Sequence, residues 1–247
     1  MPVNYNQLAE SYRKFRKPDP RIAERILYHI GDSKKILNVG AGIGAYEPVD
    51  ADITALEPSL GMILQRRNSK TKLVQGLAEH LPFRDNSFDV SMGILTIHHW
   101  SDISLGLKEM IRVTRNKIIL LTWVGYGENF WLEKYIPEIT GVDFNLFPTL
   151  EELGKILGNI LVETIKIPHD CTDGFMCAYW GRPEAYLNPD VREAISTFSR
   201  ISNIQNRLEI LKEEVKSGEW HKKYGYLLEI ESLDLGYRIV VAGKAIF

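Results

Sequence analysis

The sequence predicts an α/β fold in which helices wrap a mostly parallel sheet. Short apolar segments alternate with segments of helical periodicity over roughly the first 125 residues, as in a series of strand–helix–strand units. The first apolar segment runs into a glycine-spaced turn, Gly40-Ala41-Gly42-Ile43-Gly44, and the second ends on the carboxylate of Glu57. Connections between parallel strands of such a sheet are expected to be right-handed.

Seven strands are expected along the chain. Their residues are 35–39, 52–56, 72–75, 88–92, 117–123, 161–167 and 234–242. The fifth is almost wholly apolar or β-branched, which is typical of a strand buried on both faces. Helices are expected where apolar residues recur at helical spacing, over residues 60–67, 103–114, 150–157, 190–200 and 204–214.

The connection after the glycine turn is short. Twelve residues separate Gly44 from Glu57, and Pro48 is one of them. Because a complete crossover helix does not fit there, we expect a stub or a single turn. In a dinucleotide-binding unit the acidic residue follows about 20 residues further on, after a full helix. The short connection therefore argues against a nicotinamide cofactor.

Composition narrows the function classes. The chain has 247 residues, of which 45% are apolar, enough for a full core. A net charge of −2, with acids and bases mixed along the chain, argues against nucleic acid as a partner. The chain has no run of about 18 apolar residues and no apolar signal core at its N-terminus, so we expect no membrane partner. Two cysteines, Cys171 and Cys177, predict a reducing, cytoplasmic setting, and their spacing does not indicate a metal site.

The glycine turn and Glu57 together suit an adenosine-containing cofactor. Glycines let the backbone approach a ligand without a Cβ clash. A carboxylate at the end of the second strand can accept hydrogen bonds from both ribose hydroxyls. The turn alone is a weak signal, so the rest of the chain must identify the cofactor.

Three further motifs follow in order. Leu77-Ala78-Glu79-His80-Leu81-Pro82-Phe83 precedes the segment 85–90, and the fourth strand leaves through Gly93-Ile94-Leu95-Thr96-Ile97-His98-His99-Trp100. With the turn and Leu56-Glu57-Pro58-Ser59, this series resembles the class I S-adenosylmethionine-dependent methyltransferases, most closely the bacterial and archaeal small-molecule C-, N- and O-methyltransferases. The resemblance covers about residues 5–125 and implies S-adenosylmethionine as the cofactor.

The same resemblance implies the architecture. The expected fold is a seven-stranded, mostly parallel Rossmann-like methyltransferase sheet of order 3-2-1-4-5-7-6, with strand 7 antiparallel. Roughly 60 residues separate the last two strands, far more than a hairpin needs, and we expect a helical insertion there. The chain, 1–247, is then one methyltransferase domain with a helical lid (1–30), a sheet core (35–168 and 233–247) and an insertion between strands 6 and 7 (169–232).

The resemblance also assigns roles to single residues. Gly40, Ala41 and Gly42 would pack against the methionine and ribose, and Glu57 would accept the ribose hydroxyls. Pro58 and Met62 would flank the adenine, Ala78 and Glu79 would read its edge, and Gly93 would meet the methionine amino group. Tyr5, Tyr12 and Arg16 would form the lid. The family usually has an acid where this chain has Asn38, so we expect some loss of cofactor affinity but not loss of the site.

Candidate acceptor residues follow the fourth, fifth and sixth strands. His98 and His99 lie at the carboxyl edge of the sheet, where one of them could face the acceptor cavity and act as a base. Both could equally be loop residues hydrogen-bonded to the backbone. Trp123 and His169 are candidate pocket residues. The aromatic residues after Trp123 could line a pocket or form core, and the polar cluster at His169 favours a turn that caps a helix.

The motifs together predict transfer of a methyl group from S-adenosylmethionine to a small-molecule acceptor. In-line displacement from a sulfonium mainly requires alignment and exclusion of water, so a base is needed only if the acceptor must lose a proton. One alternative is a non-catalytic S-adenosylmethionine-binding regulatory protein. A nicotinamide-dependent oxidoreductase is the less favoured alternative. The acceptor and the oligomeric state stay open.

Overall fold

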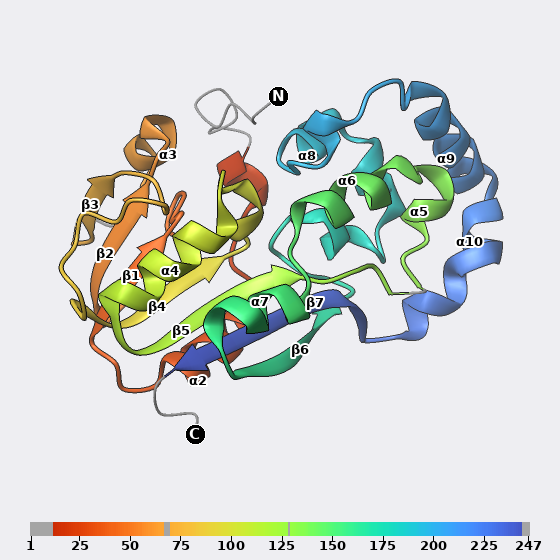
Figure 1. Ribbon diagram of the computed structural model, residues 1–247. Helices are drawn as coiled ribbons and strands as arrows, with labels where there is room; N and C mark the ends of the chain where they lie inside the picture. The colour runs from red at the N-terminus through yellow and green to blue at the C-terminus, as the bar shows by residue number, and fades with distance from the viewer. Residues whose placement is uncertain (1–11, 67–69, 128, 244–247) are drawn as a thin grey trace. The chain divides into compact units, whose positions relative to one another are not determined.

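The computed structural model describes residues 12–66, 70–127 and 129–243. Seven strands form one sheet in the order β3-β2-β1-β4-β5-β7-β6. They are β1 (Lys35–Val39), β2 (Asp52–Glu57), β3 (Lys72–Gln75), β4 (Phe88–Ile94), β5 (Thr114–Trp123), β6 (Ile160–Pro168) and β7 (Ser232–Gly243). The pairs from β3 to β5 are parallel, and β7 runs opposite to β5 (Figure 1). The predicted order and the antiparallel seventh strand are confirmed.

Five of the seven strands extend beyond their predicted ranges, β2, β6 and β7 by one or two residues at an end and β4 and β5 by two or three. β5 begins at Thr114, three residues before the predicted start, because Thr114 pairs with Phe88 on β4. A buried hydrogen bond of 2.6 Å joins the hydroxyls of Ser91 and Thr114 at this point. β4 continues to Ile94, so Gly93 lies within the strand and not just beyond it.

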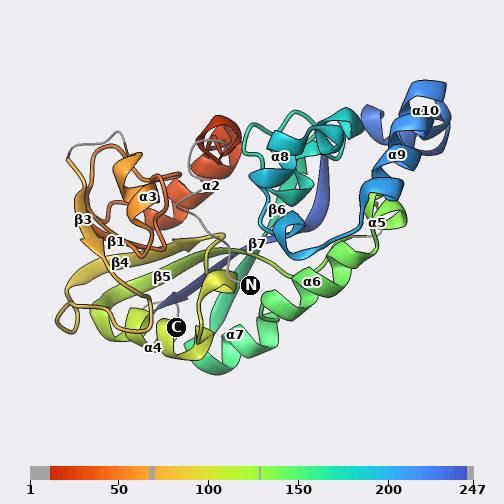
Figure 2. The ribbon, with the colours of Figure 1, turned by 90° about the horizontal axis from the view of Figure 1, so that it is seen from above.

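Four helices cover the sheet. They are α2 (Pro20–Ile30), α3 (Leu60–Leu64), α4 (Ile103–Val113) and α7 (Leu150–Leu157). Figure 2 shows α4 and α7 on one face and α2 and α3 on the other. Asp102 caps α4 through a 2.9 Å bond from the Leu105 amide, and Thr149 with Glu152 forms a capping box at α7. The predicted helix over 60–67 stops at Leu64, and residue 67 lies outside the described residues.

No helix lies between β1 and β2, as the short connection predicts. Residues 40–51 form turns, and β1 pairs directly with β2 from Lys35 opposite Asp52. The glycine turn is therefore followed by a compact loop. This loop places the ends of β1 and β2 next to each other at one edge of the sheet.

The chain divides into two compact units. Among the described residues, the sheet unit holds 20–124, 146–165 and 238–243, and the helical unit holds 12–19, 125–145 and 166–237. The predicted lid includes residues 20–30, and the predicted sheet core includes residues 125–145. The structure places 20–30 in the sheet unit, because α2 buries Ile22, Ile26 and Ile30 and its His29 carbonyl accepts a 2.6 Å bond from Lys117 on β5.

The helical unit consists of short helices and 3₁₀ turns. They are α5 (Leu132–Tyr135), α6 (Glu138–Leu146), η2 (Met176–Tyr179), η3 (Pro183–Leu187), α8 (Pro189–Glu193), η4 (Phe198–Arg200), α9 (Gln205–Ser217), α10 (Glu219–Tyr224) and η5 (Gly225–Glu229). The prediction of one helix over 190–200 is wrong, because α8 ends at Glu193. Thr197 donates its hydroxyl to buried Asp143, 2.7 Å away, and the chain breaks the helix to do so.

Within the described part of the chain, no helix is long and apolar enough to cross a membrane. Both thiols, Cys171 and Cys177, are free and buried in the helical unit.

Candidate cofactor-binding site

The glycine turn is held tightly against β2 and β4. Gly40, Gly42 and Gly44 have φ angles of 66°, 49° and 91°, which favour glycine. The Gly40 and Ala41 amides donate to the Leu56 carbonyl at 2.9 and 3.0 Å. A Cβ on Gly40 would lie 1.9 Å from the Thr96 hydroxyl oxygen, whereas a Cβ on Gly42 would meet nothing within 4 Å. One glycine therefore permits close packing, and the other leaves open space beside the backbone.

Glu57 ends β2 with its carboxylate turned toward this loop. One carboxylate oxygen accepts the Gly42 amide at 2.8 Å and the other accepts the Ser59 amide at 2.9 Å. The side chain is buried, and burial raises the pKa of Glu57 above its ordinary value although the two amides and the Arg66 guanidinium lower it. Each oxygen keeps a lone pair beyond its amide partner. The group can therefore accept further hydrogen bonds from a diol.

The predicted adenine neighbours after β2 differ in exposure. Pro58 is exposed, and its carbonyl accepts a 3.0 Å bond from Gln75 at the end of β3. Met62 is buried in α3, whose first turn is capped by the Ser59 hydroxyl, 3.2 Å from the Met62 amide.

Glu79 has a structural role. Its carboxylate accepts the Ser101 amide at 2.7 Å, the Ser101 hydroxyl at 2.8 Å and the Asp102 amide at 3.1 Å. Burial raises the pKa of Glu79, but these bonds and one from its own amide outweigh burial and bring it below the ordinary value. The carboxylate thus ties the segment after β3 to the start of α4, with buried Ala78 beside it.

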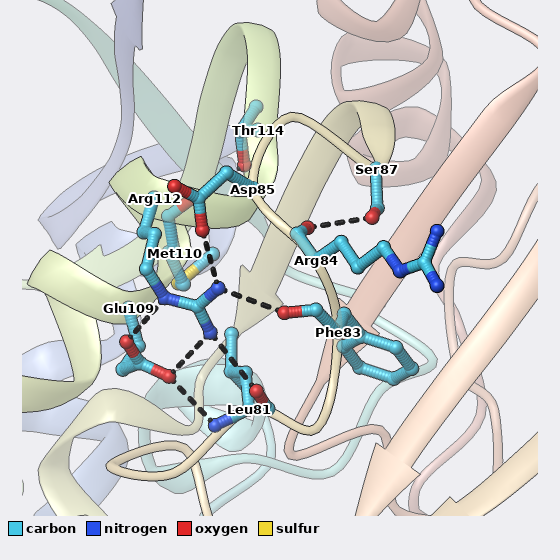
Figure 3. A network of polar contacts seen from close by, with 9 residues as sticks. All are labelled: Leu81, Phe83, Arg84, Asp85, Ser87, Glu109, Met110, Arg112 and Thr114. Carbon is cyan, nitrogen blue, oxygen red and sulfur yellow. Dashed lines mark hydrogen bonds and ion pairs between the residues drawn. The ribbon is translucent and has the colours of Figure 1, made fainter.

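Arg112 on α4 fixes the rest of the same segment. Its guanidinium donates to the carbonyls of Leu81 and Phe83 at 2.9 and 2.7 Å and to the Asp85 carboxylate at 2.8 Å (Figure 3). Glu109 completes this network, because it accepts from Arg112 at 2.7 Å and from the Leu81 amide at 2.9 Å. Hydrogen bonds to Glu109 and Asp85 raise the pKa of Arg112. The sequence does not indicate Arg112, since nothing in the motif points to an arginine about 30 residues away.

Gly93 and Thr96 form the β4 side of the site. A Cβ on Gly93 would lie 3.2 Å from the Leu120 side chain, so the strand is closely packed there. Leu95 has a φ of 49°, and this turn directs buried Thr96 against Gly40. Thr96 was not predicted. Its contact with Gly40 spans 56 residues of sequence and has no local signature.

Asn38 lies beneath the turn in central strand β1. It is buried, and its side-chain amide donates to the Glu47 carboxylate at 2.9 Å. Glu47 in turn accepts from Arg66 at 2.5 and 2.6 Å. Position 38, where the family usually has an acidic residue, thus carries a neutral amide that donates to the acidic side chain of Glu47.

The two histidines lie in η1 (Ile97–His99), directly beyond β4. His98 is buried and stacks on Phe147, with ring centroids 4.0 Å apart, and His99 lies 3.8 Å from His98. Phe147 also meets Trp123 at the end of β5, with centroids 5.4 Å apart. The structure therefore brings His98 and Trp123 together through Phe147, which the sequence did not indicate.

The predicted lid and pocket residues of the helical unit have partners within that unit. Arg16 pairs with buried Asp173 at 2.6 Å and donates to the Tyr12 hydroxyl at 2.9 Å, while Tyr5 lies outside the described residues. His169 is exposed, and its ring lies 3.4 Å from the Glu231 carbonyl. Burial raises the pKa of the neighbouring Cys171 thiol. In the portion of the chain that the structure describes, no three His, Cys, Asp or Glu side chains are grouped to hold a metal ion.

The edge of the sheet unit fits an adenosine cofactor. The turn follows β1, Glu57 ends β2 and Gly93 lies near the end of β4, and the carboxyl ends of these strands meet where open α/β sheets bind ligands. The open space at Gly42 and the inward carboxylate of Glu57 give room for a ribose and an acceptor for its hydroxyls.

Comparisons with known proteins identify the family and the fold. The model of a methyltransferase domain matches residues 37–121. The crystal structure of a protein described as a methyltransferase from an antibiotic biosynthesis pathway of Anabaena variabilis is 31% identical, with a TM-score of 0.86 over 92% of this chain and 98% of that one. A Thermotoga maritima S-adenosylmethionine-dependent methyltransferase shares the fold at 16% identity, with a TM-score of 0.59 over 99% of this chain and 100% of that one.

Curated relatives match over shorter stretches. An uncharacterized protein of Methanocaldococcus jannaschii is 30% identical over 137 residues, 53% of this chain and 55% of that protein. The chain spans about half or less of the length of such relatives. The Anabaena variabilis structure, in contrast, matches over almost its whole length. The chain belongs to the class I S-adenosylmethionine-dependent methyltransferases.

Proposed function

We propose that this protein binds S-adenosylmethionine at the edge formed by the glycine turn, Glu57 and Gly93, and transfers its methyl group to a small-molecule acceptor. The observation that carries the proposal is the buried Glu57 carboxylate, which bridges to the Gly42 amide beside open space. The bound cofactor supplies a methyl group activated by a positive sulfur.

Each part of the edge has a role in this proposal. Glu57 orients the ribose, and Gly40, Ala41 and Gly42 let the backbone approach the ribose and the methionine portion. Ala78 and Glu79 offer their backbone to the adenine on a segment that Arg112 fixes. Pro58 and Met62 pack near the adenine, and the Gly93 carbonyl accepts a hydrogen bond from the amino group of the methionine portion. Alignment of acceptor and methyl group, together with exclusion of water, provides most of the rate acceleration.

The acceptor side is proposed around His98 and Trp123. Their contacts with Phe147 form an aromatic wall beyond β4 and β5 in the sheet unit. A histidine in such a position can remove a proton from a hydroxyl or amine acceptor near neutral pH. The prediction that segment 169–232 closes the acceptor cavity, and those for Tyr12, Arg16 and His169, stay predictions.

Calorimetry with S-adenosylhomocysteine and with NAD tests the cofactor. We expect binding of S-adenosylhomocysteine only. Binding of NAD without S-adenosylhomocysteine would overturn the proposal. Incubation with methyl-labelled cofactor and a pool of cellular metabolites then tests catalysis. Label transferred to a small molecule supports a methyltransferase, whereas tight binding with no transfer to any metabolite would favour the non-catalytic alternative.

A further inference from the structure

A buried ion pair lies directly beneath the glycine turn. The side chains of Arg66 and Glu47 are 2% and 5% exposed, and their charged groups approach to 2.5 Å. An ion pair buried this completely is rarely a source of net stability, because desolvation offsets the attraction between its charges. Its position therefore calls for a reason other than stability.

Arg66 connects the pair to the turn itself. Its Nη1 donates to the carbonyls of Gly42 and Ala41 at 3.0 and 3.3 Å. A Cβ on Gly44 would lie 2.9 Å from Nη2, so the chain passes directly over the guanidinium. The planar fork of arginine holds two carbonyls and a carboxylate in a fixed geometry, whereas a lysine ammonium is a point charge on a flexible stem. Arg66 thus orients the Ala41–Gly42 peptide plane, whose amide donates to Glu57.

Glu47 connects the pair to β1. Its carboxylate accepts the Asn38 side-chain amide at 2.9 Å as well as Arg66. Tyr46, the preceding residue, is buried with a φ of 64°, a strained conformation for a residue that is not glycine. The loop adopts this conformation where it turns Glu47 inward. An aspartate at position 38 would instead face a second carboxylate.

We propose that Glu47 supplies the buried negative charge under the cofactor turn, so that Asn38, Glu47 and Arg66 act as one positioning unit for S-adenosylmethionine. The inference rests on the proposed function of this edge. In this unit Asn38 is needed as a hydrogen-bond donor to Glu47. It is not a poor substitute for the acidic residue that the family usually has at this position. Arg66 pairs with Glu47 and fixes the turn carbonyls, and the turn amide of Gly42 then fixes Glu57.

Moving the carboxylate from position 47 to position 38 tests whether Asn38, Glu47 and Arg66 act as one unit. The proteins are wild type, Asn38→Asp, Glu47→Gln and the double variant Asn38→Asp/Glu47→Gln. Calorimetry measures S-adenosylhomocysteine affinity, and thermal unfolding without ligand measures Tm. Glu163→Gln is the matched control, because Glu163 on edge strand β6 also pairs with an arginine, Arg25, at 2.6 Å.

Each single variant should weaken S-adenosylhomocysteine binding at least tenfold. Asn38→Asp places two carboxylates in contact, and Glu47→Gln leaves Arg66 buried without its counter-charge. The double variant keeps one carboxylate and one amide, so its affinity should return to within about threefold of wild type, and its Tm should recover in parallel. Glu163→Gln should leave affinity unchanged.

Two results would overturn the inference. One is tighter binding by Asn38→Asp than by wild type, since an acid at position 38 would then be what the site prefers. The other is a double variant whose loss of S-adenosylhomocysteine affinity equals the product of the losses in the two single variants. If wild type binds no S-adenosylhomocysteine, the proposed function fails, and the Tm values alone decide whether the three residues are coupled. A single variant that does not fold is judged by recovery of folding in the double variant.

Discussion

The sheet unit and the helical unit use their buried polar groups in different ways. In the sheet unit, Glu57 accepts the Gly42 amide of the glycine turn and Arg66 donates to the Gly42 carbonyl. In the helical unit they hold aromatic rings, since the Trp131 indole donates to the Trp180 carbonyl at 2.7 Å and the Tyr186 hydroxyl to the Met176 carbonyl at 2.7 Å. The difference indicates that the polar groups at the glycine turn serve binding, whereas the indole and hydroxyl groups of the helical unit serve packing.

The largest effect is expected in the packing of the helical unit. Trp131 is buried, with its ring edge-on to those of Tyr186 and Trp220. Trp131→Ala should lower the free energy of unfolding by about 3–5 kcal/mol, because it leaves a large cavity and an unpaired carbonyl. Denaturant unfolding measures this loss. Trp131→Phe, which keeps most of the ring volume, should lose clearly less. If Trp131→Ala kept its stability but lost cofactor affinity, the helical unit would serve binding and not packing.

The next effect concerns turnover in the sheet unit. His98→Ala should lower methyl transfer at least 100-fold, about 2.7 kcal/mol in the barrier, if the acceptor must lose a proton to this ring. Its affinity for S-adenosylhomocysteine should stay unchanged. His80→Ala is the control, since His80 is exposed on the segment after β3. Full turnover by His98→Ala would show that alignment alone drives the transfer.

The two units also differ in how far the sequence predicts them. The strands, the missing helix after β1 and the turn with Glu57 follow from local patterns of apolar residues, glycines and one acid. The helix predicted over 190–200 fails because Thr197 bonds to Asp143, which lies 54 residues away. α6 was not predicted, since it carries Gly141 and buried Asp143 in place of a clear apolar stripe.

Within the site, the same limit applies. Residues that contact the turn from far along the chain, namely Thr96 and Arg66, have no signature of their own. Asn38 could be recognised as a departure from the family, but not explained, because its partner Glu47 lies in an irregular loop. Phe147 was missed for a similar reason, since its contact with His98 depends on how the chain returns to the sheet after α6.

Glu57→Ala tests the binding role of the turn. Removal of a charge-assisted acceptor should weaken S-adenosylhomocysteine binding by about 1.5–3 kcal/mol, roughly ten- to hundredfold. Calorimetry measures the loss, and thermal unfolding shows that the variant is folded. The matched variant in the helical unit is Asp143→Asn, another buried carboxylate with two donors. It should lower Tm with little change in affinity. Unchanged affinity in folded Glu57→Ala would mean that the ribose lies elsewhere.

The smallest expected effect is a pH dependence that separates these two carboxylates. Burial raises the pKa of Glu57 and of Asp143, while hydrogen bonds from their partners and the charges of Arg66 and Arg200 oppose it. Between the ordinary pKa of about 4 and the raised value, the folded protein binds more protons than the unfolded chain. The stability that each group contributes is therefore complete below the ordinary pKa and is lost as pH rises through the raised pKa.

Both Glu57→Gln and Asp143→Asn should then flatten the fall in stability across this window, as measured by denaturant unfolding at successive pH values. Cofactor affinity should separate the two groups. An ionised Glu57 accepts the ribose hydroxyls, so wild-type affinity for S-adenosylhomocysteine should fall as pH drops through the raised pKa of Glu57. Glu57→Gln should abolish this pH dependence and Asp143→Asn should keep it. If Asp143→Asn abolished it instead, the helical unit would contain a group that governs binding, and the contrast between the two units would fail.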